Sequence, residues 1–427
     1  MTLDLEQKRQ FAEILEKLGE NLSITKSQHE AAVQSYAAVG NWLSKDDSIL
    51  KPYNPEVKPQ GSFIIGTTVQ PVNPEDDIDL DIVCELHGKK WDWTQEDVKR
   101  IVGDQIRNNK TYESLLDDEG RRCWTLKYRE KSNRNDRYHM DILPAIIANG
   151  YSVLLEKSFS NLENRDYDNL QLSITDKERF DFYTETDPKK WLQSNPFGYA
   201  KWFMGRVYIF EGTLTKSFSL NEAVKPTPGY QEERLPLQRV VQLLKRHRDI
   251  MFANEPNEDV RKQKPISCII TTLAARAYRG EINVLDALWG VIERMRNEIE
   301  WRTDASGKQY EWISNPVNEA ENFADRWNDD HSCRRENFYK WLDAVKEDLQ
   351  YAQSQRGLGK ISESLKKSFG DEPVTKVFAQ IGERSRLLTE QKSNCYDRQR
   401  GVMGSIASGA STLSKIPSHT FDGKSYD

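Results

Sequence analysis

The spacing of apolar residues divides the chain into a first part that mixes helices with strands and a second part that is helical. Apolar residues recur every three or four positions over 3–20 and 25–45, which is the spacing of amphipathic helices. Shorter apolar runs follow, and they indicate strands. The predicted strands cover 61–65, 78–86, 121–129 and 137–143, with a helix from Thr94 to about Arg107. This alternation predicts a mixed sheet with helices behind it.

The second part of the chain changes character in two steps. Residues 151–195 are polar and irregular, with one strand signal over 170–175, and a turn at Asn195 then leads into an aromatic helix. From about residue 232 the apolar spacing is helical. The predicted helices cover 232–249, 265–279, 283–298, 315–327, 335–353, 360–369 and 374–392.

We therefore expect an α+β protein with two lobes and a tail. The first lobe, with the N-terminal helices and the mixed sheet, covers 1–200, and a helical lobe covers 201–395. The remaining residues, 396–427, are rich in glycine, serine and alanine and predict a flexible tail.

Two carboxylates, those of Asp79 and Asp81, lie at the start of an apolar strand. Residues two apart on a strand point to the same side, so both carboxylates face one way while Leu80 and Ile82 face the core. Carboxylates this close repel each other unless a cation lies between them, and hard oxygen ligands favour Mg²⁺ or Mn²⁺. Asp77 also fits the pattern, but it belongs to the preceding loop.

A third carboxylate and a Gly-Ser pair accompany these aspartates. Asp141 lies near the end of a separate apolar strand, while Gly61 lets the backbone approach a phosphate and Ser62 offers it a hydroxyl and an N–H. An Asp-x-Asp pair alone is most often a solvated strand edge, whereas the combination is specific. It predicts two divalent ions that activate a 2′- or 3′-hydroxyl for attack on an α-phosphorus and stabilise the leaving pyrophosphate.

Two residues of the helical part are candidates for binding the triphosphate. Lys245 lies at the edge of a buried apolar stripe, where a lysine extends to water or meets an anion. Ser267 opens the next helix, where unpaired N–H groups and the helix dipole attract phosphate. Each residue alone has an ordinary structural explanation, but together with the carboxylates they predict a triphosphate site.

Composition limits the compartment and the partners. Charged residues make up 30% of the 427 positions, mean hydropathy is −0.77, and no apolar run approaches the ~18–20 residues of a membrane span. The N-terminus lacks the order of a signal peptide, and five scattered cysteines favour neither zinc nor disulfides, so we expect a cytoplasmic protein. A net charge of −6 favours a small nucleotide over long nucleic acid.

Several segments together resemble one family of enzymes. They are Gln60-Gly61-Ser62 with the following Gly-Thr-Thr, Asp79-Leu80-Asp81, His139 to Ala145, Asn195 to Phe203, and Leu237 to Asp249 followed by Lys264 to Ser267. These segments resemble the cGAS/DncV-like nucleotidyltransferases, or CD-NTases, of bacterial anti-phage CBASS systems, which belong to the DNA polymerase β-like superfamily.

The resemblance implies a two-lobed enzyme with a mixed-sheet catalytic lobe and an α-helical C-terminal lobe. It would condense nucleoside triphosphates, ATP among them, into a cyclic di- or trinucleotide that activates a separate effector, alongside CBASS regulatory proteins. The implied residues are Asp79, Asp81 and Asp141 for two Mg²⁺ ions, and Gln60, Gly61, Ser62, Lys245 and Ser267 for the nucleotide. Activation by duplex DNA is not expected, because the chain lacks the Cys/His zinc cluster of the animal DNA sensor.

Other readings remain open at the sequence level. The same chemistry could produce linear oligonucleotides, extend an RNA 3′ end or transfer AMP to a protein hydroxyl. A catalytically quiet nucleotide-binding scaffold is a further alternative. The choice of base, the linkage, the ring size, the activator and the effector cannot be read from the sequence.

Overall fold

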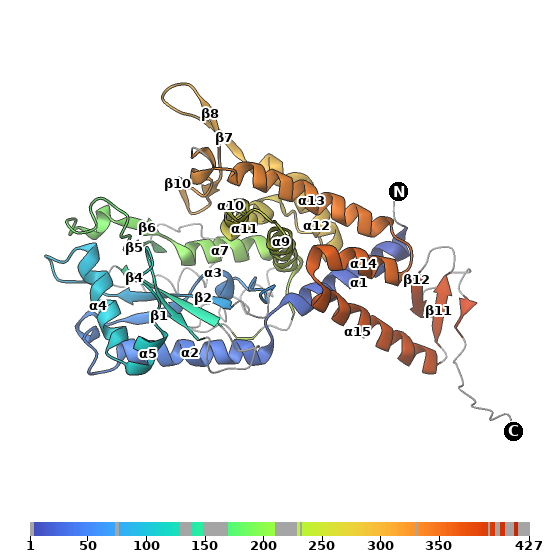
Figure 1. Ribbon diagram of the computed structural model, residues 1–427, viewed down its shortest axis with the longest axis horizontal. Helices are drawn as coiled ribbons and strands as arrows, with labels where there is room; N and C mark the ends of the chain where they lie inside the picture. Colours follow the sequence, from blue (N-terminus) through green and yellow to red (C-terminus); the bar gives the residue numbers. More distant parts are fainter. Residues whose placement is uncertain are drawn as a thin grey trace.

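The computed structural model describes residues 4–72, 77–128, 138–147, 170–209, 229–230, 233–329, 332–391, 393–397, 402–405 and 414–416. Within these ranges a sheet-containing lobe and a helical lobe lie side by side (Figure 1). No helix of the described residues combines the length and the apolar character that crossing a membrane requires.

The sheet is mixed, and its two central strands are parallel. Its described strands are β1 (Glu56–Pro59), β2 (Ile78–Leu86), β3 (Trp124–Lys127), β4 (Tyr138–Ile146), β5 (Leu172–Ile174) and β6 (Leu192–Ser194). The spatial order is β1-β2-β4-β5-β6, and β3 pairs with β4 beside β5. Only the β2–β4 pair is parallel among these pairings, and it continues over the whole of both strands.

Helices cover one face of this sheet and form the smaller of two cores. They are α2 (Lys26–Ser44), α4 (Gln95–Arg107) and the short α5 (Lys110–Leu115). Thr25 and Thr94 begin α2 and α4 with reciprocal hydrogen bonds to the residue three positions later, which satisfy N–H groups that a helix start leaves unpaired. Ile82, Cys84 and Ile142 of the sheet are fully buried in this core.

The larger core fills the helical lobe and reaches the other face of the sheet. Its helices are α1 (Leu5–Leu22), α7 (Pro196–Val207), α9 (Pro236–Ala253), α10 (Glu258–Lys262), α11 (Ser267–Ala277), α12 (Val284–Arg294), α13 (Arg334–Ser354), α14 (Leu358–Phe369) and α15 (Asp371–Glu390). Helix α9 is central and contacts α1, α7 and α10 to α14. Val83 and Leu143 join this core from the sheet, so one apolar cluster spans both lobes.

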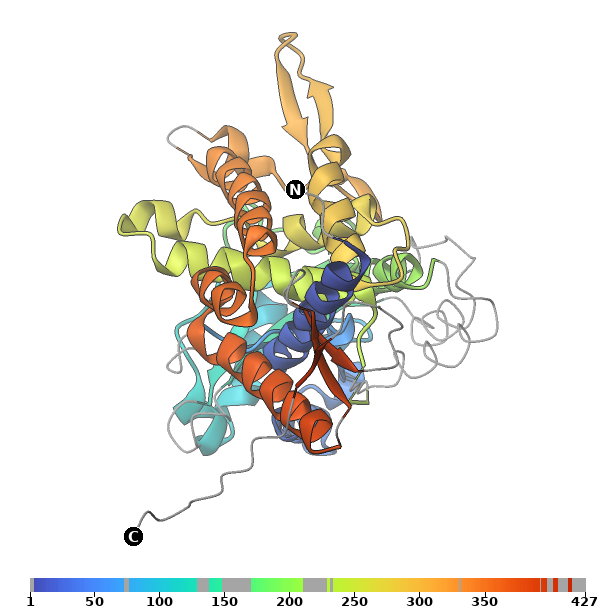
Figure 2. The same ribbon diagram turned by 90° about the vertical axis from the view of Figure 1, so that its right-hand side faces the viewer.

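Several short elements complete the described fold. Single 3₁₀ turns cover Lys51–Tyr53, Pro188–Lys190, Met295–Glu298 and Asp325–Asn328. A hairpin of β7 (Glu300–Thr303) and β8 (Gln309–Trp312) projects at the top of Figure 2, and β9 (Ser314–Asn315) pairs with β10 (Asn318–Asn322) at its base. Strands β11 (Asn394–Asp397), β12 (Val402–Ser405) and β13 (Ser414–Lys415) form a small sheet.

The apolar spacing predicted most helices and the central strands at their observed places. The prediction of a strand over 61–65 is wrong, because α3 (Gly61–Ile64) is one helical turn there. Phe63 and Ile64 are both buried, and a short apolar run does not distinguish a strand from a buried turn of helix. The predicted tail, 396–427, also contains structure, since β12 and β13 lie within it and both pair with β11, which begins just before it.

The predicted helix over 315–327 is wrong as well, because this segment forms β9, β10 and a 3₁₀ turn. Asparagine side chains explain the difference. Asn315 Oδ1 accepts from the N–H of Val317, and Asn322 Oδ1 accepts from the N–H groups of Ile313 and Ala324. Such local side-chain bonds offer the backbone an alternative to helical hydrogen bonds.

The lobe boundaries at 200 and 395 remain predictions. Helix α7 runs through residue 200, and α1, which the sequence places with the first lobe, packs against α9, α12 and α15.

Candidate active site

The parallel register of β2 and β4 brings the three predicted carboxylates together. Asp81 pairs with Asp141 across the two strands, and Asp79 pairs with His139. Alternation along β2 separates these side chains from the core, since Leu80 is 1% exposed while the Asp79 side chain is 58% exposed. The register thus places Asp141 beside the pair on the neighbouring strand, and its role as a metal ligand stays a prediction.

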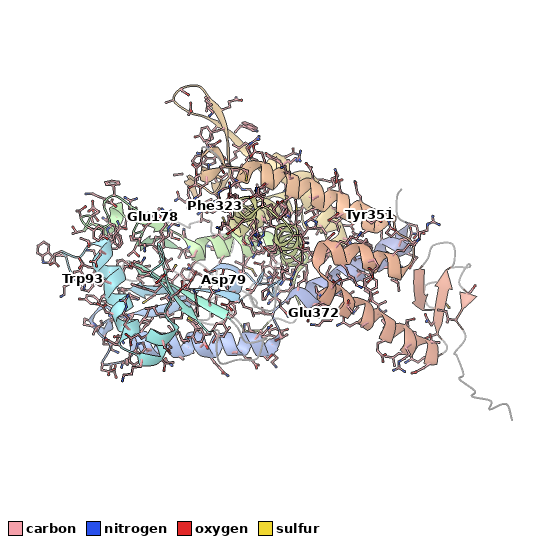
Figure 3. All side chains as sticks on the ribbon, in the orientation of Figure 1. Asp79, Trp93, Glu178, Phe323, Tyr351 and Glu372 are labelled. Atoms are coloured by element: carbon pink, nitrogen blue, oxygen red, sulfur yellow. The ribbon has the colours of Figure 1, made fainter. Side chains whose placement is uncertain are left out.

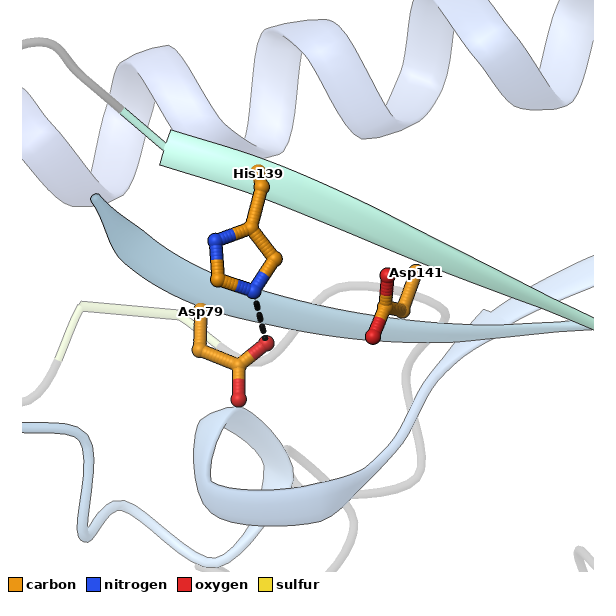
Figure 4. Close-up of side chains that lie close together, drawn as sticks. All are labelled: Asp79, His139 and Asp141. Atoms are coloured by element: carbon orange, nitrogen blue, oxygen red, sulfur yellow. Dashed lines mark ion pairs between the residues drawn. The ribbon is translucent and has the colours of Figure 1, made fainter. Parts of the chain in front are cut away.

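The side chains of Asp79, His139 and Asp141 converge on one point (Figure 4). One ligand atom from each lies within 4.8 Å of the other two, which suits a bound metal ion. His139 Nε2 lies 3.0 Å from Asp79 Oδ1, and Asp141 Oδ1 accepts a hydrogen bond from Thr125 Oγ1 at 2.5 Å. Because the Asp79 side chain is largely exposed, its ion pair with His139 leaves the carboxylate accessible to a metal ion.

The electrostatics of this group also favour a cation. Burial raises the pKa of Asp81, and the charges of Asp79 and Asp141 raise it further. Burial raises the pKa of Asp141 as well, against the hydrogen bond from Thr125. The hydrogen bond to Asp79 raises the pKa of His139. Carboxylates that resist ionisation together are stabilised as anions when a divalent ion binds between them.

His139 was not among the predicted site residues. The signal was present, since it lies two residues before Asp141 on the same strand and therefore on the same side. The same alternation that groups Asp79 with Asp81 therefore also places the imidazole on the side of the carboxylates.

The backbone of the Gly-Ser segment lies against the carboxylate of Asp81. A Cβ atom at Gly61 would come within 2.2 Å of Asp81 Oδ2, and the φ of Gly61 is +61°. The N–H of Gln60 donates to the carbonyl of Asp81 at 2.9 Å. Ser62 Oγ lies 3.1 Å from Thr68 Oγ1. A glycine at position 61 thus meets both a conformational and a spatial requirement.

One polar face of α9 holds the loop that follows the Gly-Ser segment. Four of its side chains, spaced by three or four residues or adjacent, donate to backbone carbonyls of that loop. The pairs are Gln238 with Ile65 (2.9 Å), Gln242 with Thr68 (3.0 Å), Lys245 with Thr67 (3.3 Å) and Arg246 with Gln70 (2.9 Å). The helical lobe therefore fixes the position of the loop that contacts Ser62.

Lys245 and Ser267 lie on the helical side of the same cleft. Lys245 is 5% exposed; burial lowers its pKa to about 8, the charge of Arg248 adds to this, and the nearby Asp79 and Asp81 oppose it. Ser267 is exposed at the start of α11, and its Oγ lies 3.0 Å from an Arg248 guanidinium nitrogen. A buried lysine of this kind needs an anionic partner to remain charged.

These residues line a cleft of about 1120 Å³ between the lobes. Seven of the eight predicted residues line it: Gln60, Gly61, Ser62, Asp79, Asp81, Lys245 and Ser267. The eighth, Asp141, is the cross-strand partner of Asp81. The cleft is also lined by Tyr199, Asn315, Glu321 and Phe323, and Figure 3 labels Phe323 above Asp79. Asn315, Glu321 and Phe323 were not predicted as site residues, because the apolar spacing of 315–327 predicts a helix there.

Comparisons with known proteins agree with this geometry. The family model described as "Cyclic GMP-AMP synthase DncV-like, nucleotidyltransferase domain" matches residues 55–144. A c-di-GMP synthase from Roseivirga ehrenbergii is 27% identical over 395 residues, 92% of each chain. The cyclic dinucleotide synthase CdnG from Bradyrhizobium diazoefficiens is 24% identical over 91% of this chain and 87% of its own.

Solved structures share the fold. The structure of Bradyrhizobium diazoefficiens CdnG in complex with GTP matches with a TM-score of 0.60 at 20% identity, covering 87% of this chain and 99% of that one. The structure of E. coli MS115-1 CdnC with ATP matches with a TM-score of 0.53 at 15% identity, covering 86% and 98%. Residues 55–144 thus match a DncV-like nucleotidyltransferase domain, and along nearly its whole length the chain is similar to cyclic dinucleotide synthases and shares the two-lobed α+β fold of the solved CD-NTase structures.

Proposed function

We propose that this chain condenses nucleoside triphosphates into a cyclic di- or trinucleotide, with Mg²⁺ as its cofactor and pyrophosphate as the second product. The observation that carries the proposal is one cleft whose sheet side presents Asp79 and Asp81, with Asp141 paired behind them, and whose helical side presents Lys245 and Ser267. The names of the two curated relatives, both cyclic dinucleotide synthases, support the cyclic product.

Each residue has a role in the proposed reaction. A hydroxyl oxygen of one nucleotide bonds to the α-phosphorus of another, the bond to the pyrophosphate oxygen breaks, and the hydroxyl proton leaves to solvent or a cleft carboxylate. Asp79, Asp81 and Asp141 would hold the divalent ions, with His139 as a further nitrogen donor. Bound divalent ions would lower the pKa of the attacking hydroxyl and neutralise charge on the leaving group. Ser62, Lys245 and Ser267 bind and orient the triphosphate, and Gln60 and Gly61 shape the backbone beside it.

The proposal extends to the biological setting. Nucleoside triphosphates are the substrates, and the cyclic product serves as a second messenger that activates an effector in CBASS anti-phage defence. The five cysteines are free, which supports action in the reducing cytoplasm. The solved relatives in complex with GTP and ATP support purine triphosphates as ligands.

The test is an assay of the purified chain with Mg²⁺ and labelled triphosphates. We expect a phosphatase-resistant product, and we expect the double variant Asp79→Asn/Asp81→Asn to lose at least ~10³-fold activity because the ion-binding charge is gone. Asp343→Asn is the matched control, because Asp343 is an exposed residue of α13 and pairs with Arg296 at the surface. Addition of a chelator should abolish the product, and added Mg²⁺ should restore it.

The alternatives give different outcomes. Phosphatase-sensitive label indicates linear oligonucleotides, and label that remains on RNA or protein indicates transfer to a macromolecule. Nucleotide binding by calorimetry without turnover indicates a scaffold. Equal product from the wild type and the double variant would refute the assignment of these carboxylates.

A further inference from the structure

The wall of the cleft formed by β9 and β10 carries an acid–amide pair that the catalytic assignment does not use. Asn315 Nδ2 donates to Glu321 Oε2 at 2.8 Å, and both residues line the cleft. Asn315 is 5% exposed, whereas Glu321 is partly exposed. Among the described side chains, Asn315 is the one hydrogen-bond donor to this carboxylate, and that bond occupies one of its two oxygens.

The orientation of this pair is fixed by its surroundings. Asn315 Oδ1 accepts from the N–H of Val317 at 3.0 Å, so its amide nitrogen must face Glu321. Behind the pair, Arg276 donates to the carbonyl of Ser314 at 2.8 Å and to its hydroxyl at 2.6 Å. The carboxylate is thereby oriented toward the cleft, and because each of its oxygens has two lone-pair sites, both oxygens can still accept a hydrogen bond from a ligand.

The pair lies beside an aromatic wall and close to the start of α11. Phe323 and Tyr199 both line the cleft, and their rings meet edge to face with centroids 6.3 Å apart. The Tyr199 hydroxyl is 2.8 Å from Thr272 Oγ1, so the ring rather than the hydroxyl faces ligands. Burial raises the pKa of the Cys268 thiol to about 12, and the charge of Glu321 contributes next. Glu321 therefore lies near the residue that follows Ser267.

We propose that Glu321, held by Asn315, recognises the base of the bound nucleotide and selects guanine. This inference rests on the proposed function and names the base that the cleft prefers. The Watson–Crick edge of guanine presents two adjacent donors, N1–H and the N2 amino group, which match a carboxylate. Adenine presents an acceptor at N1, which the same carboxylate repels. Phe323 and Tyr199 provide the apolar surface against which the base lies.

The test compares GTP with ITP, which lacks only the N2 amino group, and with ATP. Dissociation constants are measured by calorimetry in the presence of Mg²⁺. We expect wild type to bind GTP about 10- to 100-fold more tightly than ITP, the range for one hydrogen bond to a charged group. In Glu321→Gln this preference for GTP over ITP should fall below about threefold. The affinity for ATP should rise relative to the affinity for GTP, because a glutamine amide can donate to adenine N1.

The control is Glu319→Gln, since Glu319 is exposed on the same strand and lies outside the cleft lining. The ratio of its dissociation constants for ITP and GTP should equal that of wild type. The melting temperatures of all three proteins should agree within a few degrees. If Glu321→Gln weakened the binding of GTP, ITP and ATP equally, the inference would be overturned, because Glu321 would then contact the ribose or the phosphates and not the base. An unchanged GTP/ITP ratio would overturn it too.

The two proposals fail separately. A chain that prefers GTP over ITP through Glu321 but forms no cyclic product would support this inference and refute the proposed function. A chain that forms a cyclic product with the same base composition in wild type and Glu321→Gln would support the proposed function and overturn this inference.

Discussion

Gly61 is the residue whose missing Cβ atom matters both for the backbone conformation and for the catalytic site. Its φ of +61° lies in the left-handed region, and the space a side chain would fill holds the carboxylate of Asp81. A methyl group there would push this carboxylate away from Asp79 and Asp141. The predicted role of Gly61, close approach of the backbone to a phosphate, therefore has a second component, which is room for a metal-binding oxygen.

We predict that Gly61→Ala lowers nucleotidyltransferase activity at least tenfold and destabilises the fold by ~1–3 kcal/mol, the usual cost of a strained backbone conformation. Gly88→Ala is the control, because Gly88 has a φ of +100° but no atom lies within 4 Å of its added Cβ. Denaturant unfolding should show a cost for both variants, while product formation should fall only in the first. Full activity in Gly61→Ala would contradict the close packing.

The residues of the site differ in how far the sequence predicts them. Asp79, Asp81 and Asp141 follow from two-residue alternation on apolar strands, which is a local property. Glu321 and Asn315 do not, because their place in the cleft depends on a hairpin that asparagine side chains stabilise. The spacing of apolar residues in that segment fits a helix equally well, so periodicity alone could not have found them.

At the scale of elements, the pairing of α9 with the loop after α3 connects the two lobes. The chain forms this contact through side-chain donors and backbone carbonyls, and Gln242 is fully buried within it. Sequence spacing predicted the helix and its apolar stripe correctly. It did not predict what the polar face of α9 contacts, because a buried polar face looks the same in sequence as a solvated one.

We predict that Gln242→Ala destabilises the protein by ~1–3 kcal/mol, because the carbonyl of Thr68 and the hydroxyl of Ser23 lose a buried donor. The KM for nucleotide should rise more than kcat falls, since the loop contacts Ser62 rather than the reacting carboxylates. Steady-state kinetics and urea unfolding measure the two effects. Gln380→Ala, at an exposed position of α15 whose side chain accepts one long surface hydrogen bond from Asn21, should leave KM and stability nearly unchanged. A lower kcat with the same KM would contradict this role.

For the whole molecule, the distribution of apolar residues argues against two independent folding units. The larger core includes Leu18 of α1, Val83 of β2 and Leu237 of α9. It therefore joins the N-terminal helix, the sheet and the helical lobe. A boundary near residue 200 divides the sequence but does not divide this core. Units that share a core are expected to unfold together.

We predict that Leu18→Ala, at a side chain 1% exposed, lowers the free energy of unfolding by ~2–5 kcal/mol and accelerates amide exchange in both β2 and α9. Leu5→Ala is the control on the same helix, because Leu5 is 64% exposed, and it should change stability by less than ~0.5 kcal/mol. Hydrogen exchange with mass spectrometry resolves the two regions. Faster exchange in α9 with no change in β2 would show that the lobes open separately.

The hairpin of β9 and β10 shares no strand with the sheet that carries the aspartates. If its acid–amide pair selects the base, then the residues that form the phosphodiester bond and the residues that select the base lie on separate segments of the backbone. Exchanging residues 313–323 between related chains would then change the base composition of the product and leave the rate of phosphodiester formation as it is.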